Sequence, residues 1–290
     1  MSVNTLSRAQ PTPVDVKSNF IDASGLKTHY LTCGDPSKPP IILIHGGGAG
    51  ATAMGNWQGT FDLFAKTHYV IAPEMLGFGQ TAKPQNIAYS QDDRVNHMKA
   101  FLDAMDLTGI PLVGNSMGGA TSLGICMKWP EAVSDLVLMG SAGLNVEITP
   151  AMMPILGYDF TIEGMHKLIS ALTGPLYTAS EETIKARHEG SLDPDGRVAY
   201  TKAMGWIREQ GGLAYAEEEI SQVKNRTLVV NGKDDIVVPL AYGIRFMELL
   251  ENSTGYFMPH IGHWVMIEAP EEFAEVVQGF LARNPGTGAA

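Results

Sequence analysis

The sequence predicts an α/β protein: a mostly parallel sheet with helices on both faces and a helical cap insertion. Short apolar runs, bounded by Pro or Gly, alternate along the chain with longer segments whose apolar residues recur every three or four positions. Strands that alternate with helices form parallel sheets that are covered on both faces. One long stretch rich in helix formers interrupts the alternation, and we interpret it as the insertion.

Six short runs have the apolar character of strands, and five longer segments have helical character. The predicted strands are residues 27–33, 40–45, 69–72, 110–113, 136–139 and 227–230. The predicted helices are residues 57–65, 92–105, 117–129, 240–251 and 271–283. In the second of these helices, Val95, Met98 and Phe101 recur at helical spacing, which gives the helix one apolar face.

The interruption of the alternation divides the chain. Residues 17–144 and 223–284 are expected to form the core and residues 145–222 the cap, while the segments 1–16 and 285–290 lack periodicity and are expected to be flexible. Ligands of open α/β sheets bind at the carboxyl ends of the strands, so the cap is expected there. Four cap methionines could line an apolar pocket or simply pack helices together: Met152, Met153, Met165 and Met204.

Composition excludes several classes of partner. The 290 residues carry a formal net charge of −11, which repels phosphate backbones and anionic lipid surfaces, so neither nucleic acid nor a membrane is expected as a partner. No signal-peptide core and no apolar stretch of about 18 residues is present. The two cysteines, Cys33 and Cys126, fit neither a disulfide framework nor a zinc site, which predicts free thiols, no metal and a cytoplasmic location. We also expect a homo-oligomer, of a size that the sequence does not indicate.

A serine motif lies between an apolar run and a helical segment. It reads Gly114-Asn115-Ser116-Met117-Gly118, which is G-x-S-x-G in the strand–turn–helix context of the α/β-hydrolase fold. The glycines let neighbouring elements approach without Cβ clashes, and the helix start supplies N–H groups where an oxyanion would form. The motif predicts Ser116 as a nucleophile at a strained turn.

A serine nucleophile needs a histidine base and an orienting acid, which in this fold follow it in the order Ser, Asp or Glu, His. The turn after the apolar run at 227–230 carries Asp234 and Asp235, and the residues alone do not decide between them. Further on, His260 ends a strand-like segment, whereas His263 follows a glycine on a predicted loop. We therefore expect His263 to be the base.

The loop after the run at 40–45 is rich in glycine and reads His45-Gly-Gly-Gly-Ala-Gly50. In this fold such a loop supplies the second N–H of the oxyanion hole. The alternative is a phosphate-binding turn, but the chain has no G-x-x-x-x-G-K-[ST] pattern. The loop therefore predicts an oxyanion hole.

Taken together, these residues resemble those of the meta-cleavage product hydrolases, which hydrolyse a carbon–carbon bond of 2-hydroxy-6-oxohexa-2,4-dienoates in bacterial degradation of aromatic compounds. The resemblance covers nearly the whole chain, and the segments 158–161 and 205–212 look like the branch that handles aryl-substituted substrates. The motifs that carry it are His45-Gly-Gly-Gly, Gly-Asn-Ser-Met-Gly-Gly-Ala-Thr at 114–121, Leu-Met-Gly-Ser-Ala-Gly at 138–143, Gly-Lys-Asp-Asp at 232–235 and Gly-His-Trp at 262–264.

The resemblance implies a reaction and a set of site residues. Cleavage of a 6-aryl dienoate would release 2-hydroxypenta-2,4-dienoate and a carboxylic acid such as benzoate, with no cofactor. Because the leaving carbanion must be stabilised by conjugation, the substrate has to be converted first to its keto tautomer, held by its carboxylate and 2-oxygen. The implied roles are acid for Asp235, oxyanion hole for Gly47 and Met117, and substrate binding for Gly48, Asn56, Asn115, Arg187 and Trp264.

Two alternatives use the same fold. A carboxylesterase or lactonase would share the serine, histidine and aspartate but would not need the polar set that includes Asn56, Asn115 and Arg187. A non-catalytic ligand receptor would keep the pocket without needing an intact triad.

Overall fold

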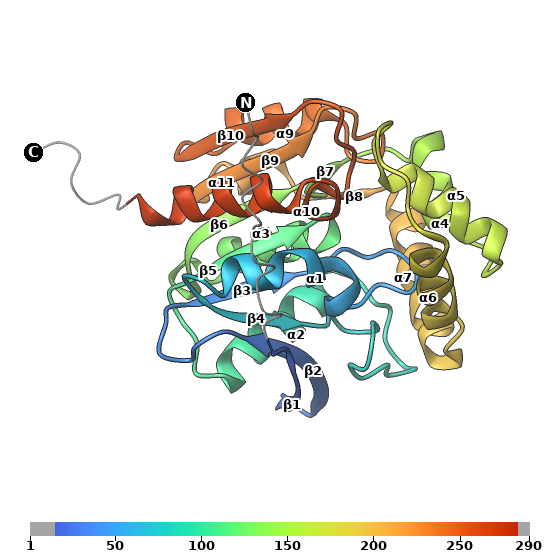
Figure 1. Ribbon diagram of the computed structural model, residues 1–290, viewed down its shortest axis with the longest axis horizontal. Helices are drawn as coiled ribbons and strands as arrows, with labels where there is room; N and C mark the ends of the chain where they lie inside the picture. The colour runs from blue at the N-terminus through green and yellow to red at the C-terminus, as the bar shows by residue number, and fades with distance from the viewer. Residues whose placement is uncertain (1–14, 284–290) are drawn as a thin grey trace, which may run out of the picture.

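An eight-stranded sheet forms the centre of the protein, which a computed structural model describes over residues 15–283 (Figure 1). The spatial order of its strands is β1-β2-β4-β3-β5-β6-β9-β10. The pairs from β4 to β10 are parallel, and β1 and β2 join antiparallel at one edge, so the predicted mostly parallel sheet is confirmed. The strands are β1 (Lys17–Ala23), β2 (Leu26–Cys33), β3 (Pro40–Ile44), β4 (Tyr69–Pro73), β5 (Ile110–Asn115), β6 (Val133–Met139), β9 (Arg226–Gly232) and β10 (Ser253–Met258).

Helices cover both faces of the sheet. α1 and α11 pack against each other on one face, and α2 and α3 pack against each other on the other (Figure 1). The central strand β3 is consequently buried over residues 41–44. The helices of this core are α1 (Ala53–Phe64), α2 (Gln91–Ala104), α3 (Met117–Lys128), η1 (Pro130–Ala132), α8 (Glu217–Ile220), α9 (Leu240–Leu249), α10 (Val265–Glu268) and α11 (Pro270–Ala282).

Local signals explain two differences from the predicted elements. Helix α1 begins before the expected residue 57, because the Thr52 side chain accepts a hydrogen bond from the Gly55 N–H and caps the helix. Strand β1 was not predicted, because alternate residues of this edge strand remain exposed and its sequence has no apolar run.

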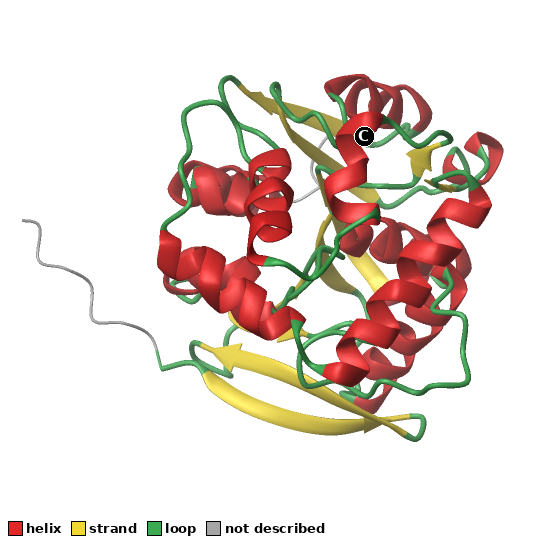
Figure 2. Cartoon of the chain, turned by 90° about the vertical axis from the view of Figure 1, so that its right-hand side faces the viewer, coloured by secondary structure: helices red, strands yellow, loops and turns green. Residues whose placement is uncertain are grey.

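A separate group of helices lies beside the sheet, at the right of Figure 1 and facing the viewer in Figure 2. It consists of η2 (Pro150–Met152), α4 (Met153–Leu156), α5 (Ile162–Leu172), α6 (Glu181–Ser191) and α7 (Pro194–Gln210). The chain enters and leaves this group through a short antiparallel pair, β7 (Leu144–Asn145) and β8 (Leu213–Ala214). Afterwards, α8 contacts α3 of the core.

The predicted flexible ends at 1–16 and 285–290 lie, apart from residues 15 and 16, outside the described residues. Within residues 15–283, no helix is both long and apolar enough to cross a membrane. Over the same residues, no cluster of three or more His, Cys, Asp or Glu side chains could hold a metal ion.

A buried histidine on α2 makes the stability of the fold sensitive to acid. Burial lowers the pKa of His97 from 6.5 to about 4, and its Nε2 lies 2.8 Å from the Thr28 hydroxyl of β2. His97 takes up a proton near pH 6.5 in the unfolded chain but only near pH 4 in the folded chain. The free energy of unfolding that neutral His97 contributes is therefore complete above pH 6.5 and is lost as the pH falls from 6.5 to 4. We expect the free energy of unfolding to fall by about 2 kcal/mol between pH 7 and pH 5 from this residue alone.

Chemical denaturation at the two pH values measures this loss. His97→Gln keeps a polar partner for Thr28 but does not titrate, so it should flatten the pH dependence relative to the parent. An identical pH slope in both proteins would show that another group causes the acid sensitivity.

Candidate active site

Ser116 occupies the sharp turn between β5 and α3. Its φ of 54° and ψ of −118° are strained for a residue with a side chain, and its backbone is held by hydrogen bonds from its N–H to the Met139 carbonyl and from the Ala142 N–H to its own carbonyl, at 3.0 and 3.1 Å. Ser116 is partly exposed, while the residues on either side of it are buried. The turn therefore pushes the hydroxyl out of the sheet.

Close backbone packing explains the two glycines of the motif. A Cβ at Gly114 would lie 2.6 Å from the Gly119 Cα, and one at Gly118 would lie 2.8 Å from the Ile44 carbonyl carbon. Real Cβ atoms essentially never approach other atoms this closely. Any other residue at either position would push α3 away from β3 and β5 and would move Ser116.

His263 and Asp235 form a buried pair beside Gly140, the residue after Met139, whose carbonyl accepts from the Ser116 N–H; a Cβ at Gly140 would lie 3.1 Å from His263 Nδ1. The Nδ1 of His263 lies 2.7 Å from Asp235 Oδ2, and both side chains are almost fully buried. Asp235 Oδ1 accepts hydrogen bonds from the Val237 and Val238 N–H groups at 2.9 and 2.8 Å, which fixes the carboxylate. The imidazole is thus held by the acid on one side and keeps Nε2 for another partner.

The two competing residues lie elsewhere. Asp234 is exposed, and its Oδ2 accepts a hydrogen bond from the His260 N–H at 2.9 Å. His260 is also exposed and has a positive φ of 63°. These two residues hold the turn together but do not join the buried pair.

The glycine-rich loop after β3 lies against the start of α3. A Cβ at Gly47 would lie 2.6 Å from Met117 Sδ, and one at Gly46 would lie 3.4 Å from the Ser116 Cβ. The first N–H groups of a helix have no acceptor within the helix, so that of Met117 is available beside the loop. The structure therefore brings the predicted oxyanion-hole residues Gly47 and Met117 together with Ser116.

His45 fixes the beginning of this loop. Its Nε2 accepts a hydrogen bond from the Met75 N–H at 3.0 Å, so its Nδ1 carries the proton and donates to the Gly46 carbonyl at 2.7 Å. Burial lowers the pKa of His45, which keeps the ring neutral. The histidine of the motif is therefore a fixed hydrogen-bonding bridge between two loops.

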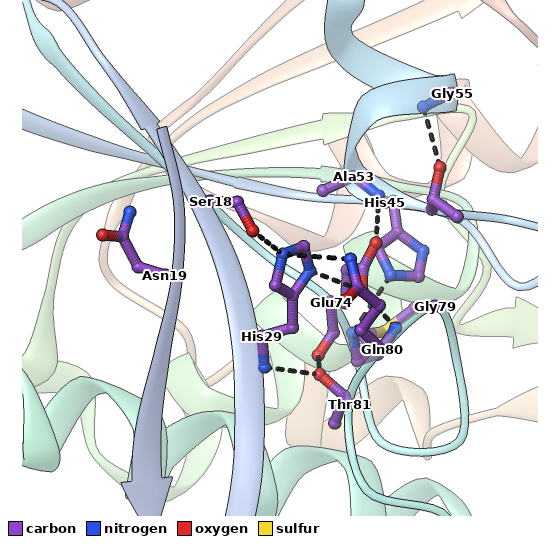
Figure 3. A network of polar contacts seen from close by, with 12 residues as sticks. Ser18, Asn19, His29, His45, Ala53, Gly55, Glu74, Gly79, Gln80 and Thr81 are labelled. Atoms are coloured by element: carbon purple, nitrogen blue, oxygen red, sulfur yellow. Dashed lines mark hydrogen bonds and ion pairs between the residues drawn. The ribbon is translucent and has the colours of Figure 1, made fainter. Parts of the chain in front are cut away.

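A buried carboxylate, Glu74, ties together the segments behind the loop (Figure 3). It accepts from His29 Nδ1 on β2 at 2.7 Å, from the Gln80 N–H at 2.6 Å and from the Ala53 N–H at 3.3 Å. Ala53 is the first residue of α1, where a negative charge also compensates the helix dipole. The network anchors the start of the helix that carries Asn56. No sequence pattern predicts this network, because its members are far apart in the chain.

Two predicted substrate-binding amides lie side by side. Asn56 Nδ2 donates to Asn115 Oδ1 at 3.4 Å, and Asn115 Nδ2 donates to the Met139 carbonyl at 3.2 Å. Asn56 Oδ1 is buried without a hydrogen-bond partner among residues 15–283. The pair is therefore fixed at one end and unsatisfied at the other.

Arg187 extends from cap helix α6 to the core. It is only 8% exposed, its guanidinium lies 4.7 Å from the ring centre of Trp264, and its Nη2 would be 2.6 Å from a Cβ at Gly48. Its Nε has no hydrogen-bond partner, and within residues 15–283 no carboxylate pairs with it. Burial lowers its pKa to about 10, so it remains charged at neutral pH.

Trp264 also connects the cap to the core. Its backbone N–H donates to the Leu172 carbonyl at the end of α5, at 3.1 Å, and its ring lies under Arg187. The predicted residues Gly48, Arg187 and Trp264 are thus brought together where α5 and α6 meet the loops of the sheet.

An apolar pocket opens at Ser116. Its empty volume is about 490 Å³, including the part open to solvent. Two of the cap methionines, Met152 and Met204, line it, whereas Met165 is buried by helix packing and Met153 is about half exposed. The complete lining is Gly47, Ser116, Met117, Ala142, Asn145, Met152, Ile155, Leu156, Met204, Ile207, Leu213, Val237 and Val238. Arg187 and Asn56 lie outside it, so the site has a polar and an apolar part.

Comparison with known proteins identifies the family. The family model described as the alpha/beta hydrolase fold matches residues 39–270. A 2-hydroxy-6-oxo-6-(2'-aminophenyl)hexa-2,4-dienoic acid hydrolase of Metapseudomonas resinovorans is 50% identical over 91% of both chains. The chain belongs to the meta-cleavage product hydrolases. A second relative, the 2-hydroxy-6-oxo-2,4-heptadienoate hydrolase of Pseudomonas putida, is 34% identical to this chain. The match covers 90% of this chain and 94% of the relative.

Solved structures agree with this membership. A serine hydrolase involved in carbazole degradation superimposes with a TM-score of 0.85 at 47% identity, over 92% of this chain and 99% of its own. A meta-cleavage product hydrolase from Pseudomonas fluorescens gives 0.85 at 33% identity, over 91% and 97%. These findings confirm the predicted fold and family and favour neither the esterase nor the receptor alternative. Like its relatives, this protein is therefore a hydrolase that acts on a small molecule.

The geometry around His263 leads to a prediction about the two aspartates. Asp235→Asn should lower turnover about a thousandfold or more, because the amide cannot hold His263 in the tautomer that accepts a proton. Asp234→Asn keeps an oxygen that can accept from the His260 N–H, so its turnover should stay within about threefold of the parent. Steady-state kinetics of both variants test this prediction. A greater loss of turnover for Asp234→Asn would mean that Asp234, and not Asp235, orients the histidine.

Proposed function

We propose that this hydrolase cleaves 2-hydroxy-6-oxo-6-aryl-hexa-2,4-dienoates to 2-hydroxypenta-2,4-dienoate and an aromatic carboxylic acid. Ser116, His263 and Asp235 form its catalytic triad, and the N–H groups of Gly47 and Met117 form its oxyanion hole. The observation that carries the proposal is the buried guanidinium of Arg187, which pairs with no carboxylate among residues 15–283 and lies beside a site that otherwise suits an ester or ketone.

An unpaired buried charge is unfavourable unless a ligand supplies the opposite charge. Arg187 and the unsatisfied acceptor Asn56 Oδ1 together fit a planar group with an anion at one end and a hydroxyl group next to it that can donate. The 2-hydroxydienoate head has this chemistry: its carboxylate pairs with Arg187, and its 2-hydroxyl donates to Asn56 Oδ1, with Asn115 beside it. The Trp264 ring and Gly48 complete this part of the site.

The C6 substituent enters the apolar pocket on the other side of Ser116. The pocket is lined mainly by aliphatic side chains and by Met152 and Met204, which adapt to flat rings. The relative that is 50% identical is named for an aminophenyl substrate, which supports an aryl group here.

Catalysis follows from this placement. His263 assists conversion of the bound dienolate to its keto form, which lets the departing carbon share its electrons with the conjugated system. Ser116 attacks C6 as its proton passes to His263, and the oxyanion hole binds the developing charge. The C5–C6 bond breaks, and its electron pair moves through the conjugated system to the 2-oxygen, which takes up the proton to give 2-hydroxypenta-2,4-dienoate. Water then hydrolyses the acyl-serine to the acid.

We further propose that the enzyme works in the cytoplasm as a homo-oligomer. Cys33 and Cys126 are both buried and free, which suits a reducing compartment.

The substrate assignment is tested by the loss of the yellow dienolate absorbance with 6-phenyl and 6-methyl substrates side by side. We expect hydrolysis of both, with a higher kcat/KM for the phenyl compound because its ring fills the apolar pocket. If neither compound is hydrolysed, the proposed function is refuted. A higher kcat/KM for the methyl compound would refute the aryl assignment.

Ser116→Ala should reduce cleavage by at least about a thousandfold, because no other group here can form the acyl intermediate. It should still bind the substrate, since Arg187 and the amides hold the other end. Stopped-flow absorbance spectra of the variant with substrate measure both properties. Turnover within about tenfold of the parent would exclude Ser116 as the nucleophile.

Arg187→Gln separates dienoate cleavage from ester hydrolysis. Removal of a charge-assisted contact worth about 1.5–3 kcal/mol should lower dienoate kcat/KM by at least about tenfold. Hydrolysis of p-nitrophenyl benzoate, which has no carboxylate, should change by less than about threefold. Equal losses on the two substrates would mean that Arg187 supports the cap rather than binding the carboxylate.

A further inference from the structure

The apolar pocket contains one side chain that does not suit an apolar ligand. Asn145, the last residue of β7, lines the pocket among alanine, leucine, isoleucine, valine and methionine side chains, and it separates this pocket from an outer groove that Val146 and Trp206 also line. It is only 3% exposed. Its Oδ1 is buried with no hydrogen-bond partner, and within residues 15–283 its amide makes no side-chain hydrogen bond.

Such an amide is costly in the free enzyme. A buried acceptor without a partner loses its bonds to water and gains none from the protein, whereas a leucine of similar size would fill the same space without that loss. The amide is not needed to hold the strand pair either, because Asn145 pairs with Leu213 through the backbone. The side chain therefore has no visible structural function in this segment.

The position of Asn145 relative to the nucleophile is fixed by the backbone. The Ala142 N–H donates to the Ser116 carbonyl at 3.1 Å, and the next N–H, that of Gly143, donates to the Leu213 carbonyl at 3.1 Å. The short segment from 142 to 145 thus runs from the nucleophile turn along the pocket wall. A ring bound at Ser116 through its acyl carbon would extend past this wall.

We infer that Asn145 is a specificity-determining residue that selects C6 aryl groups bearing a hydrogen-bond donor, such as an amino or hydroxyl substituent. This inference rests on the proposed function and specifies its substrate class. The donor satisfies Asn145 Oδ1, while the rest of the ring packs against the aliphatic wall. A plain phenyl ring covers the amide and leaves it unsatisfied, which weakens binding of that substrate relative to the donor-bearing one.

The test compares matched rings in two proteins. Substrates with 2-, 3- or 4-aminophenyl at C6 are measured against the methylphenyl compounds of the same size, in the parent and in Asn145→Leu. The readout is the ratio of kcat/KM for each amino compound to that for its methyl partner. For at least one ring position, the parent should favour the amino compound, and the substitution should lower the ratio by about three- to tenfold.

A matched control distinguishes loss of the amide from general disturbance of the pocket. Met204→Leu changes the same wall without changing its polarity, so it should leave the amino-to-methyl ratio as it is in the parent. Ratios that are the same in the parent and Asn145→Leu at all three positions would overturn the inference. If the 6-phenyl substrate is cleaved in that case, the proposed function stands without it; if no dienoate is cleaved, the function itself fails.

A second measurement does not depend on the folding of the variant. Aminobenzoates and methylbenzoates are compared as product inhibitors of the parent enzyme, with the amino or methyl group at the same ring positions. At least one aminobenzoate should inhibit at a concentration about threefold or more below that of its methyl partner. Equal inhibition by every amino and methyl pair would also contradict the inference that Asn145 Oδ1 accepts a hydrogen bond from the ring substituent.

Discussion

The close approach of three backbone segments at Ser116 is the constraint on which the site depends. Strand β5, the start of α3 and the end of β3 meet where Gly114 and Gly118 leave no room for a side chain. This contact forces Ser116 into its strained conformation and places the helix start against the glycine-rich loop. The proposed nucleophile and the proposed oxyanion hole are therefore consequences of one packing contact rather than separate features.

The buried charges of the site are of two kinds. The Asp235 carboxylate is satisfied within the protein, because it accepts from His263 and from two backbone N–H groups. The Arg187 guanidinium has no carboxylate partner in the described chain and only the Trp264 ring beneath it. The satisfied carboxylate fixes the geometry of the proposed triad, and the unsatisfied guanidinium is where the proposed substrate would supply the missing partner.

The cap and the core build the pocket jointly. Arg187 reaches Gly48 from α6, and the Trp264 N–H is bonded to the end of α5. The pocket wall combines residues of β7, β8, the cap helices and the turn after Asp235. Small shifts of the cap would therefore change which substituent fits beside Ser116 while leaving the geometry of the proposed triad in the core unchanged. Division of labour of this kind lets one catalytic core serve different substrates.

The sequence by itself determined the features that depend on local pattern. Apolar runs and helical periodicity gave the α/β class, and G-x-S-x-G between a strand and a helix located Ser116. The half-exposed edge strand β1 escaped prediction because it lacks an apolar run. Only the tertiary structure decided which aspartate reaches His263, since Asp234 and Asp235 are adjacent and their side chains leave the turn in different directions. It likewise decided which cap methionines line the pocket and showed the unsatisfied amide of Asn145, because burial and hydrogen bonding depend on segments that are distant in the chain.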